Sequence, residues 1–248
     1  MITMPDPCVI GVVSQKGGVG KTVLAVNLSV ILRLKGYRVL TVDGDTSDPN
    51  IALQLGMENA NIGFKELATK RDKLDGVVAI HGATGLHVVL GTIRSKPYIL
   101  TKADVKRLAS KLKGGNYDFI ILDTAPGFYE PEAMKLLDEA ILVATPDTPA
   151  VTGILRLNRI LKGTGAERYI VLNKVKGKKY ELQADEIEDA SGDKVVAAIP
   201  DDDLVNESLA ERIPACMMGR SSEFSKAVTK LAIRLSAGRK RIRDSGPE

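Results

Sequence analysis

The stretch CVIGVVSQKGGVGKT at residues 8–22 decides the fold, because a run of apolar residues leads directly into a glycine-rich loop. Residues 9–14 have the β-branched composition of a buried strand, and an apolar helical pattern begins at Thr22. A strand, a glycine-rich loop and a helix in this order make a cradle for phosphate groups, since backbone N–H groups converge there beside the helix N-terminus. The stretch therefore predicts an α/β protein that binds a nucleotide.

The loop also predicts where each part of the nucleotide lies. Glycines allow backbone N–H groups to approach phosphate oxygens without a Cβ in the way. Lys21 is expected on the β- and γ-phosphates, and the Thr22 hydroxyl is expected to coordinate Mg²⁺. The residues expected to hold the nucleotide here are Gly17, Gly18, Val19, Gly20, Lys21, Thr22 and Val23.

Similar apolar runs recur along the rest of the chain. They lie at 8–14, 38–43, 86–91, 119–123, 140–144, 169–173 and 195–199. Helical patterns separate several of them, at 21–35, 101–113, 150–161 and 180–190, and a further apolar helical face spans 223–235. Continuously apolar strands alternating with helices favour a single doubly wound, mainly parallel β-sheet flanked by helices on both faces. We expect one domain over residues 1–237 and a basic, polar tail over 238–248.

Composition excludes several classes of protein. The 248 residues are 44% hydrophobic and 27% charged, and the apolar runs are too short to span a bilayer. The first residues do not have the pattern of a secretory signal, which favours the cytoplasm. The net charge of +4 is too small to indicate nucleic acid by itself. Cys8 and Cys216 are far apart in the sequence and predict neither a disulfide framework nor a metal site within one subunit.

The first position of the loop departs from the common phosphate-loop pattern, because Gln15 stands where a glycine is usual and Lys16 follows it. The sequence KGGVGKT at 16–22 resembles the deviant Walker A ATPases of the MinD/ParA family, and the resemblance covers nearly the whole chain. It implies that Lys16 reaches across a dimer interface to the nucleotide of the other subunit. It also implies a homodimer on ATP binding and slow ATP hydrolysis that an unidentified activating protein stimulates.

Carboxylates follow two of the expected strands. Asp43-Gly44-Asp45 resembles the D-x-D motif of the family, which implies that Asp45 is one of the metal-site residues and orients or activates the attacking water. Asp43 is expected to support Mg²⁺ and the loop. Asp123 ends the apolar run 119–122, a pattern that delivers a carboxylate to Mg²⁺ through water. Gly127 resembles a switch position that senses the γ-phosphate through its N–H.

The base of the nucleotide is expected at the ends of two later strands, where the sequence resembles the adenine-binding positions of the family. Asn173 has the paired donor and acceptor that an adenine edge needs, and the backbone from Pro200 to Asp202 is expected to wall the base. GTPases normally carry an aspartate two residues after the lysine of a similar Asn-Lys pair, whereas this chain has Lys176. ATP is therefore the expected nucleotide.

The branch of the family and the partner stay open. Residues 199–210 resemble the MinD branch, whereas Gln15 before Lys16 is more typical of ParA. The basic segments Lys174–Lys179 and Arg239–Arg243 are candidate surfaces for non-specific DNA, and membrane binding is less favoured. The alternative is a regulator of a partner protein, or a metal-cluster maturation ATPase, that binds neither DNA nor membrane. A single Cys216 per subunit would supply such a dimer with only two thiolate ligands.

Overall fold

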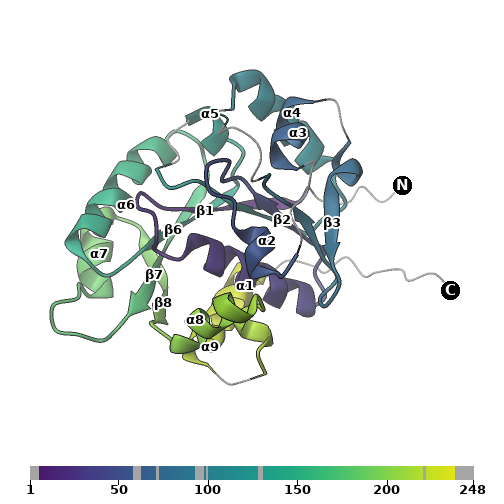
Figure 1. Ribbon diagram of the computed structural model, residues 1–248. Coiled ribbons are helices and arrows are strands. Elements are labelled where there is room, and N and C mark those ends of the chain that lie inside the picture. Colours follow the sequence, from purple (N-terminus) through teal and green to yellow (C-terminus); the bar gives the residue numbers. More distant parts are fainter. Residues whose placement is uncertain are drawn as a thin grey trace.

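The computed structural model describes residues 6–57, 63–70, 73–92, 98, 100–127, 131–219 and 222–237, and an eight-stranded sheet lies at its centre (Figure 1). The strands are β1 Cys8–Val13, β2 Val39–Asp43, β3 Val78–His81, β4 Leu86–Val89, β5 Phe119–Asp123, β6 Glu139–Ala144, β7 Glu167–Val175 and β8 Lys194–Pro200. Their order is β3-β4-β2-β5-β1-β6-β7-β8. Every neighbouring pair is parallel except β3 and β4. The predicted doubly wound, mainly parallel sheet is confirmed.

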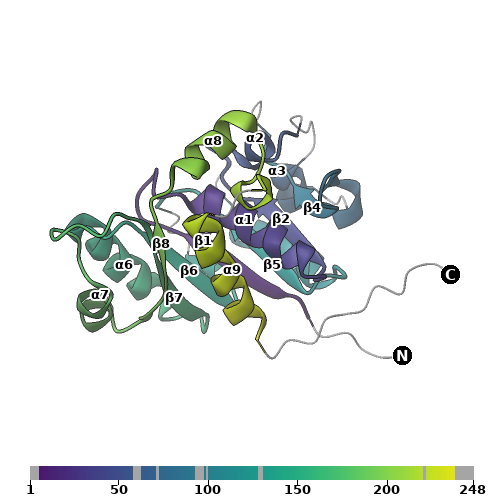
Figure 2. The same cartoon turned by 90° about the horizontal axis from the view of Figure 1, so that it is seen from below.

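Helices cover both faces of this sheet. They are α1 Lys21–Leu34, α2 Ile51–Gln54, α3 Phe64–Thr69, α4 Lys102–Lys113, α5 Pro131–Met134, α6 Thr148–Leu161, α7 Ala184–Ser191, α8 Asp203–Glu211 and α9 Glu223–Ser236. One buried apolar cluster joins α3, α4, α5, α6 and α7 to the sheet, and a second joins α1, α2 and α9 to the other face. Figure 2 shows α1 and α9 together on that second face. Two covered faces explain why β1, β2, β5 and β6 are buried along their whole length.

The structure corrects one predicted helix. The pattern at 180–190 predicted a helix from Tyr180, but α7 begins at Ala184. The preceding residues form a loop in which the Glu181 carboxylate accepts hydrogen bonds from the backbone N–H groups of Lys176 and Lys178. Gln183 then has an extended backbone, with φ −80° and ψ 160°, and is the N-cap, so the helix begins only after it.

The sequence prediction also missed the strand β3 and the helices α2, α3, α5 and α8. These elements are between 4 and 9 residues long, so each shows too few periods of hydrophobicity to be recognised.

No described helix is both long and apolar enough to cross a membrane. The expected tail 238–248, including the basic segment 239–243, lies outside the described residues. The predicted domain boundary at residue 237 therefore stays a prediction.

Candidate functional site

A cleft of about 600 Å³ opens at the carboxyl ends of the parallel strands. Ligands of open α/β sheets bind at this edge, and the volume suits a molecule of nucleotide size. Its lining includes most of the predicted site residues, namely Gly17, Gly18, Gly20, Lys21, Thr22, Val23, Asp45, Asn173, Pro200 and Asp202.

The phosphate loop, residues 15–22, joins β1 to α1 and owes its path to glycine. Gly18 and Gly20 have positive φ angles of 74° and 92°, a region that L side chains rarely adopt. A Cβ at Gly20 would also lie 2.3 Å from Nδ2 of Asn173. Gly20 is the N-cap of α1, so the unpaired N–H groups of the first helical turn face the cleft.

Lys21 and Thr22 line the cleft, and Asp123 is buried beneath Thr22 without lining the cleft itself. The Thr22 hydroxyl donates to Oδ2 of Asp123 at 2.6 Å, while Oδ1 of Asp123 is buried and has no hydrogen-bond partner. Burial raises the pKa of Asp123 to about 7, although the bond from Thr22 and the charge of Lys21 oppose the rise. Burial likewise lowers the pKa of Lys21. A hydroxyl beside a carboxylate with a free buried oxygen is the donor set that a hard divalent cation such as Mg²⁺ takes.

The two carboxylates after β2 have different positions. Oδ1 of Asp45 accepts hydrogen bonds from the N–H groups of Ser47 and Asp48, both at 3.0 Å, and from the Ser47 hydroxyl at 2.5 Å. Asp45 thus fixes its own loop while lining the cleft. Asp43 is buried below the cleft, where its Oδ2 accepts the N–H of Ile51 at the start of α2. Burial and the charge of Asp123 raise the pKa of Asp43 to about 8.

Asp43 does not line the cleft. Its observed contacts support the loop, and contact with a metal stays a prediction.

Lys16 points away from the cleft of its own chain. Its Nζ lies 3.3 Å from Oδ1 of Asp147, and both side chains are nearly half exposed. The same carboxylate accepts the Ala150 N–H and caps α6.

Val19 packs its side chain into the core and does not line the cleft. Any role of Val19 toward the nucleotide is therefore confined to its backbone.

The end of β7 holds the phosphate loop through two consecutive carbonyl groups. Asn173 Nδ2 donates to the Val19 carbonyl oxygen, and Lys174 Nζ donates to the Gly18 carbonyl oxygen, each at 2.8 Å. Lys174 adopts a positive φ of 58°, which is uncommon for a residue with a side chain. Lys176 lies 3.5 Å from Asp201. The first half of segment 174–179 is therefore part of the cleft and not a separate basic surface.

Asp202 acts through its side chain as well as its backbone. Its Oδ1 accepts the Leu204 N–H at 3.0 Å and caps α8, and its Oδ2 accepts the Phe224 N–H at 3.3 Å near the start of α9. One carboxylate thus joins two helices that line the cleft. The sequence predicted only a backbone wall at Asp202, so this role of its side chain was not expected.

Several lining residues escaped the sequence analysis. They are Gln54 of α2, Val205, Asn206 and Leu209 of α8, and Phe224 of α9. The likeness of 199–210 to the MinD branch pointed to the right segment. The spacing of Val205 and Leu209 at i and i+4 was the available signal that one helix face meets the ligand.

The structure also bears on two other residues of the sequence analysis, Gly127 and Cys216. The N–H of Gly127, expected to sense a γ-phosphate, donates to the Ser14 carbonyl oxygen at 2.9 Å. Burial raises the pKa of the Cys216 thiol to about 12, which disfavours the thiolate that a metal would need. No group of three or more His, Cys, Asp or Glu among the described residues is arranged to hold a metal.

Comparisons with known proteins agree with this geometry. The model of the CobQ/CobB/MinD/ParA nucleotide binding domain matches residues 10–215. The septum site-determining protein MinD of Thermotoga maritima is 30% identical over 243 residues, covering 92% of this chain and 87% of that protein. An uncharacterised ATP-binding protein of Methanocaldococcus jannaschii is 28% identical over 229 residues, covering 90% and 86%. The solved septum site-determining protein MinD of Pyrococcus horikoshii, complexed with Mg-ADP, superposes with a TM-score of 0.80 at 29% identity, covering 93% and 96%.

Proposed function

The chain belongs to the CobQ/CobB/MinD/ParA family of nucleotide-binding proteins, and from that membership we propose that it is a Mg-ATP-dependent switch ATPase that dimerises when it binds ATP. The observation that carries this proposal is the contact of Thr22 with Asp123 beside Lys21 on the phosphate loop. This is the arrangement that holds a nucleotide phosphate together with a divalent cation.

Nucleotide and Mg²⁺ binding follow from the residues of the cleft. Lys21 neutralises the β- and γ-phosphates, and the N–H groups of the loop bind their oxygens. Mg²⁺, when bound, would offset phosphate charge, and Thr22 with Asp123 would hold it. The free buried oxygen of Asp123 supports this assignment, because a buried carboxylate oxygen without a partner is costly. The complex of a 29% identical relative with Mg-ADP supports the same ligands here.

Hydrolysis requires a positioned water and compensation of developing negative charge. Asp45 is at the cleft, held by Ser47 and Asp48, and we assign to it the orientation of the attacking water. Lys16 is on the surface outside its own cleft, which leaves it available to the nucleotide of a second subunit. There its ammonium group would stabilise the transferred phosphoryl group in the manner of an arginine finger.

The biological role proposed with this chemistry is spatial positioning or partitioning in the cytoplasm, switched by an activating protein. Relatives named for septum site determination support it. We also propose that a surface of this protein binds its target while ATP is present and releases that target after hydrolysis.

The test is the oligomeric state of an Asp45→Ala variant in Mg-ATP. We expect slow hydrolysis and accumulation of a dimer by size-exclusion chromatography with light scattering, while ADP leaves a monomer. Turnover at the wild-type rate in this variant, or a monomer in both Mg-ATP and ADP, would refute the proposed switch. Asp48→Ala is the matched control, since Asp48 contributes only its backbone N–H to the carboxylate of Asp45.

A further inference from the structure

A second cavity, of about 270 Å³, lies at the opposite edge of the sheet from the nucleotide cleft. We call it the amino-edge cavity, because most of its residues come just before or at the starts of the parallel strands β2, β4 and β5. It is lined by Arg33, Arg38, Val39, Asp75, Gly85, His87, Asn116 and Tyr117. None of these residues lines the nucleotide cleft. The volume suits a small molecule of a few non-hydrogen atoms.

The amino-edge cavity is built by the far ends of elements that hold the nucleotide site. α1 begins at Lys21 and carries Arg33 in its last turn. β2 leads from Val39, beside the cavity, to Asp43, below the cleft. Since β2 is 5 residues long, the two sites are about 16 Å apart along this strand. A ligand in the amino-edge cavity therefore does not compete with the nucleotide for space.

Two guanidinium groups line the amino-edge cavity from different elements. Nε of Arg33 donates to the carbonyl oxygen of Gly85 at 3.1 Å, in the turn between β3 and β4. Arg38 precedes β2, where its backbone N–H donates to Oδ2 of Asp118 at 2.7 Å and its Nε lies 3.9 Å from the same oxygen. These contacts fix both side chains at the wall of the cavity. A guanidinium group presents its donors in a planar fork that matches the oxygens of a carboxylate or a phosphate.

An aromatic pair forms another wall of the cavity. Nδ1 of His87 lies 3.0 Å from the hydroxyl of Tyr117, and the two rings meet edge to face with centroids 5.6 Å apart. Burial and the charge of Arg33 lower the pKa of His87, and Asp75 opposes them. Burial raises the pKa of Tyr117 to about 12, where Asp75 adds to the rise and Arg38 opposes it. Both rings therefore respond to the charges that line the cavity.

The acidic side of the cavity is weaker than its basic side. Among the described residues that line it, Asp75 is the one with a carboxylate, and it lies in the short helix η1 Leu74–Gly76. Asp75 is exposed, so water hydrates it, whereas the side chain of Arg38 is only 15% exposed. Charges act more strongly where water is excluded. This arrangement favours an anionic ligand over a cationic one.

We propose that the amino-edge cavity binds a small molecule through a carboxylate or phosphate group, with Arg33 and Arg38 as the groups that bind its oxygens. The hydroxyl of Tyr117 and the carboxamide of Asn116 supply further hydrogen-bonding groups for the rest of the molecule. This site goes beyond the ATP switch, because no step of the proposed hydrolysis uses these residues. Its presence does not depend on dimerisation or turnover.

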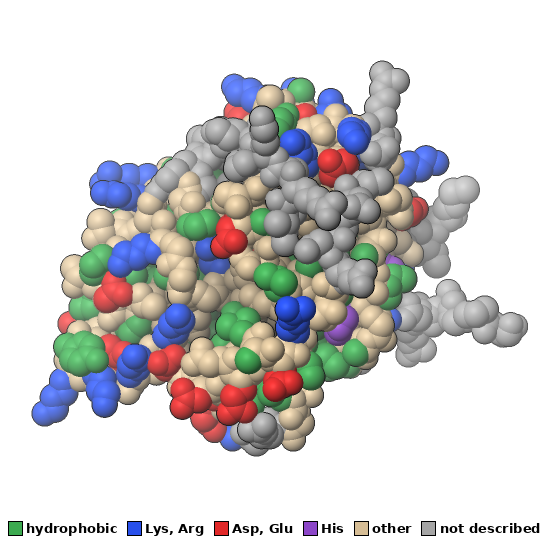
Figure 3. Space-filling view, in the orientation of Figure 1, with side chains coloured by type: hydrophobic (Ala, Val, Ile, Leu, Met, Phe, Trp, Pro, Cys, Tyr) green, Lys and Arg blue, Asp and Glu red, His purple; other side chains and the backbone are tan. Residues whose placement is uncertain are grey.

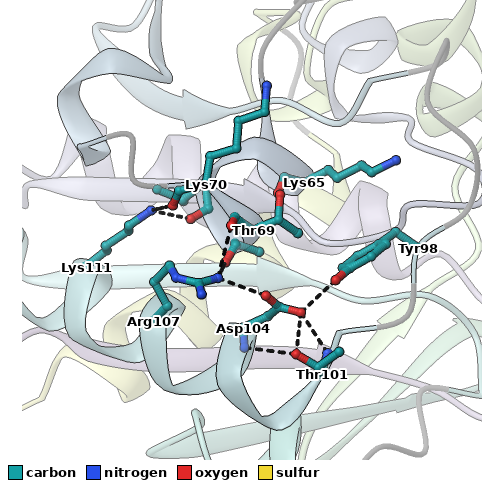
Figure 4. A network of polar contacts seen from close by, with 10 residues as sticks. Lys65, Thr69, Lys70, Tyr98, Thr101, Asp104, Arg107 and Lys111 are labelled. Carbon is teal, nitrogen blue, oxygen red and sulfur yellow. Dashed lines mark hydrogen bonds and ion pairs between the residues drawn. The ribbon is translucent and has the colours of Figure 1, made fainter.

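Other parts of the molecule are less suited to a small anion. Arg107 donates to the carbonyl oxygens of Ala68 and Thr69 (Figure 4), and Arg168 makes a two-point contact with the carboxylate of Asp193. Acidic side chains gather at the lower edge of Figure 3, over α8. The exposed acidic residues of α8 are Asp203, Glu207 and Glu211. Their charge would repel an anion, so the amino-edge cavity is the place to test.

The experiment follows the ring resonances of the two histidines of the full chain by NMR. His87 lines the cavity and His81 does not, so His81 is an internal reference. Sulfate and malonate are the probes, at a constant ionic strength of about 0.15 M kept with sodium chloride. Mg-ADP is present because sulfate could also enter the phosphate loop. Probes of this size should bind with a Kd of about 1 mM. Binding should shift the His87 resonances saturably and raise the pKa of His87, because the anion offsets the charge of Arg33.

Three variants test which groups bind the probe. Arg38→Met should weaken binding at least about tenfold. Arg156→Met is the matched control, since it removes an exposed arginine of α6 that does not line the cavity, and it should change the affinity less than about twofold. Asp75→Asn should strengthen binding about threefold, because it removes the opposing carboxylate. A misfolded variant would not bind more tightly, and melting temperatures check that each variant folds.

Four outcomes would overturn the inference. They are a His87 resonance that neither probe moves, an equal shift with chloride alone, equal affinity in Arg38→Met and the wild-type protein, and weaker binding in Asp75→Asn. Tighter binding of sulfate would assign a phosphate group to the ligand, and tighter binding of malonate would assign a carboxylate. Both results support the site. ATP turnover is not part of the readout, so failure of the proposed switch would leave the result unchanged.

Discussion

At the scale of single residues, the site depends on side chains that hold the phosphate loop as much as on those that face the ligand. Asn173 and Lys174 donate to adjacent carbonyl groups of the loop. The close approach of Asn173 to Gly20 explains why the loop has no side chain there. The residue expected to read the base therefore also fixes the position of the phosphate loop.

Lys16→Ala should reduce ATP turnover by about 10³-fold, since removal of a cation supplied in trans costs that much in related phosphoryl transfers. ATP binding by the monomer should change by less than about threefold, because Lys16 lies outside its own cleft. Phosphate release and equilibrium binding of a fluorescent ATP analogue measure the two effects. Asp147→Asn is the matched control, as it removes the charge partner of Lys16 and still caps α6. If Asp147→Asn lost the same activity, Lys16 would act only through that contact.

Asp202→Ala should lower the free energy of unfolding by about 1–2 kcal/mol, because it removes the N-cap of α8 and the acceptor for the Phe224 N–H. Nucleotide affinity should fall as well, since both helices line the cleft. Urea unfolding and ADP titration test this pair of effects. Asp203→Ala, at an exposed position of the same helix, should be nearly neutral; equal destabilisation by the two would contradict the double cap.

At the scale of elements, α4 shows how a helix that does not line the cleft connects with the loop after β2, which does. The hydroxyl of Thr46, next to Asp45, accepts the Tyr98 N–H and donates to the Tyr98 carbonyl oxygen. The Tyr98 hydroxyl in turn donates to Asp104 at the start of α4. A continuous series of hydrogen bonds thus joins the loop after β2 to α4.

Asp104 should make this protein sensitive to acid. Burial alone would raise its pKa, but hydrogen bonds from Thr101 and Tyr98, with Arg107, hold the pKa at about 2, below the usual 3.8. Because the folded pKa is the lower one, the stabilisation is present above about pH 4 and is lost as pH falls toward 2. It amounts to about 1 kcal/mol after allowance for solvent screening.

The measurement is urea unfolding of wild type and Asp104→Asn between about pH 2 and pH 7. The variant should be less stable at pH 7, and the difference should shrink toward pH 2. A constant difference across this range would show that the carboxylate charge is not the cause. Tyr98→Phe removes one of the hydrogen bonds and should lie between the two proteins.

At the scale of the whole molecule, nucleotide binding should stabilise the fold because α1, β7, β8, α8 and α9 all contribute residues to one cleft. Mg-ADP at about 100 times its dissociation constant should add about 2.7 kcal/mol and raise the melting temperature by several degrees. EDTA should remove most of this shift, and Mg²⁺ without nucleotide should cause little. Thr22→Ala should weaken the Mg²⁺ dependence; an equal shift with EDTA would contradict the assigned cation site.

Much of the fold followed from local patterns. Apolar runs placed the central strands within one or two residues, because strands buried on both faces must be apolar throughout. Short elements such as α8 and β3 could not be predicted from local patterns, since their place depends on tertiary packing and on caps such as Asp202. The predicted start of α7 was wrong for the same kind of reason, since the helix begins only after Gln183, whose backbone is extended in the folded chain.

The sequence by itself determined the phosphate loop and the sheet type, because these depend on backbone geometry that only certain residues permit close to one another in the chain. The tertiary structure alone decided that Asn173 and Lys174 hold that loop from more than 150 residues away. It also decided that Asp43 supports α2 below the cleft and that Arg107 and Lys111 of α4 bind the last carbonyl groups of α3. Such roles depend on which distant groups share a buried or charged environment, and environment is set when the chain has folded.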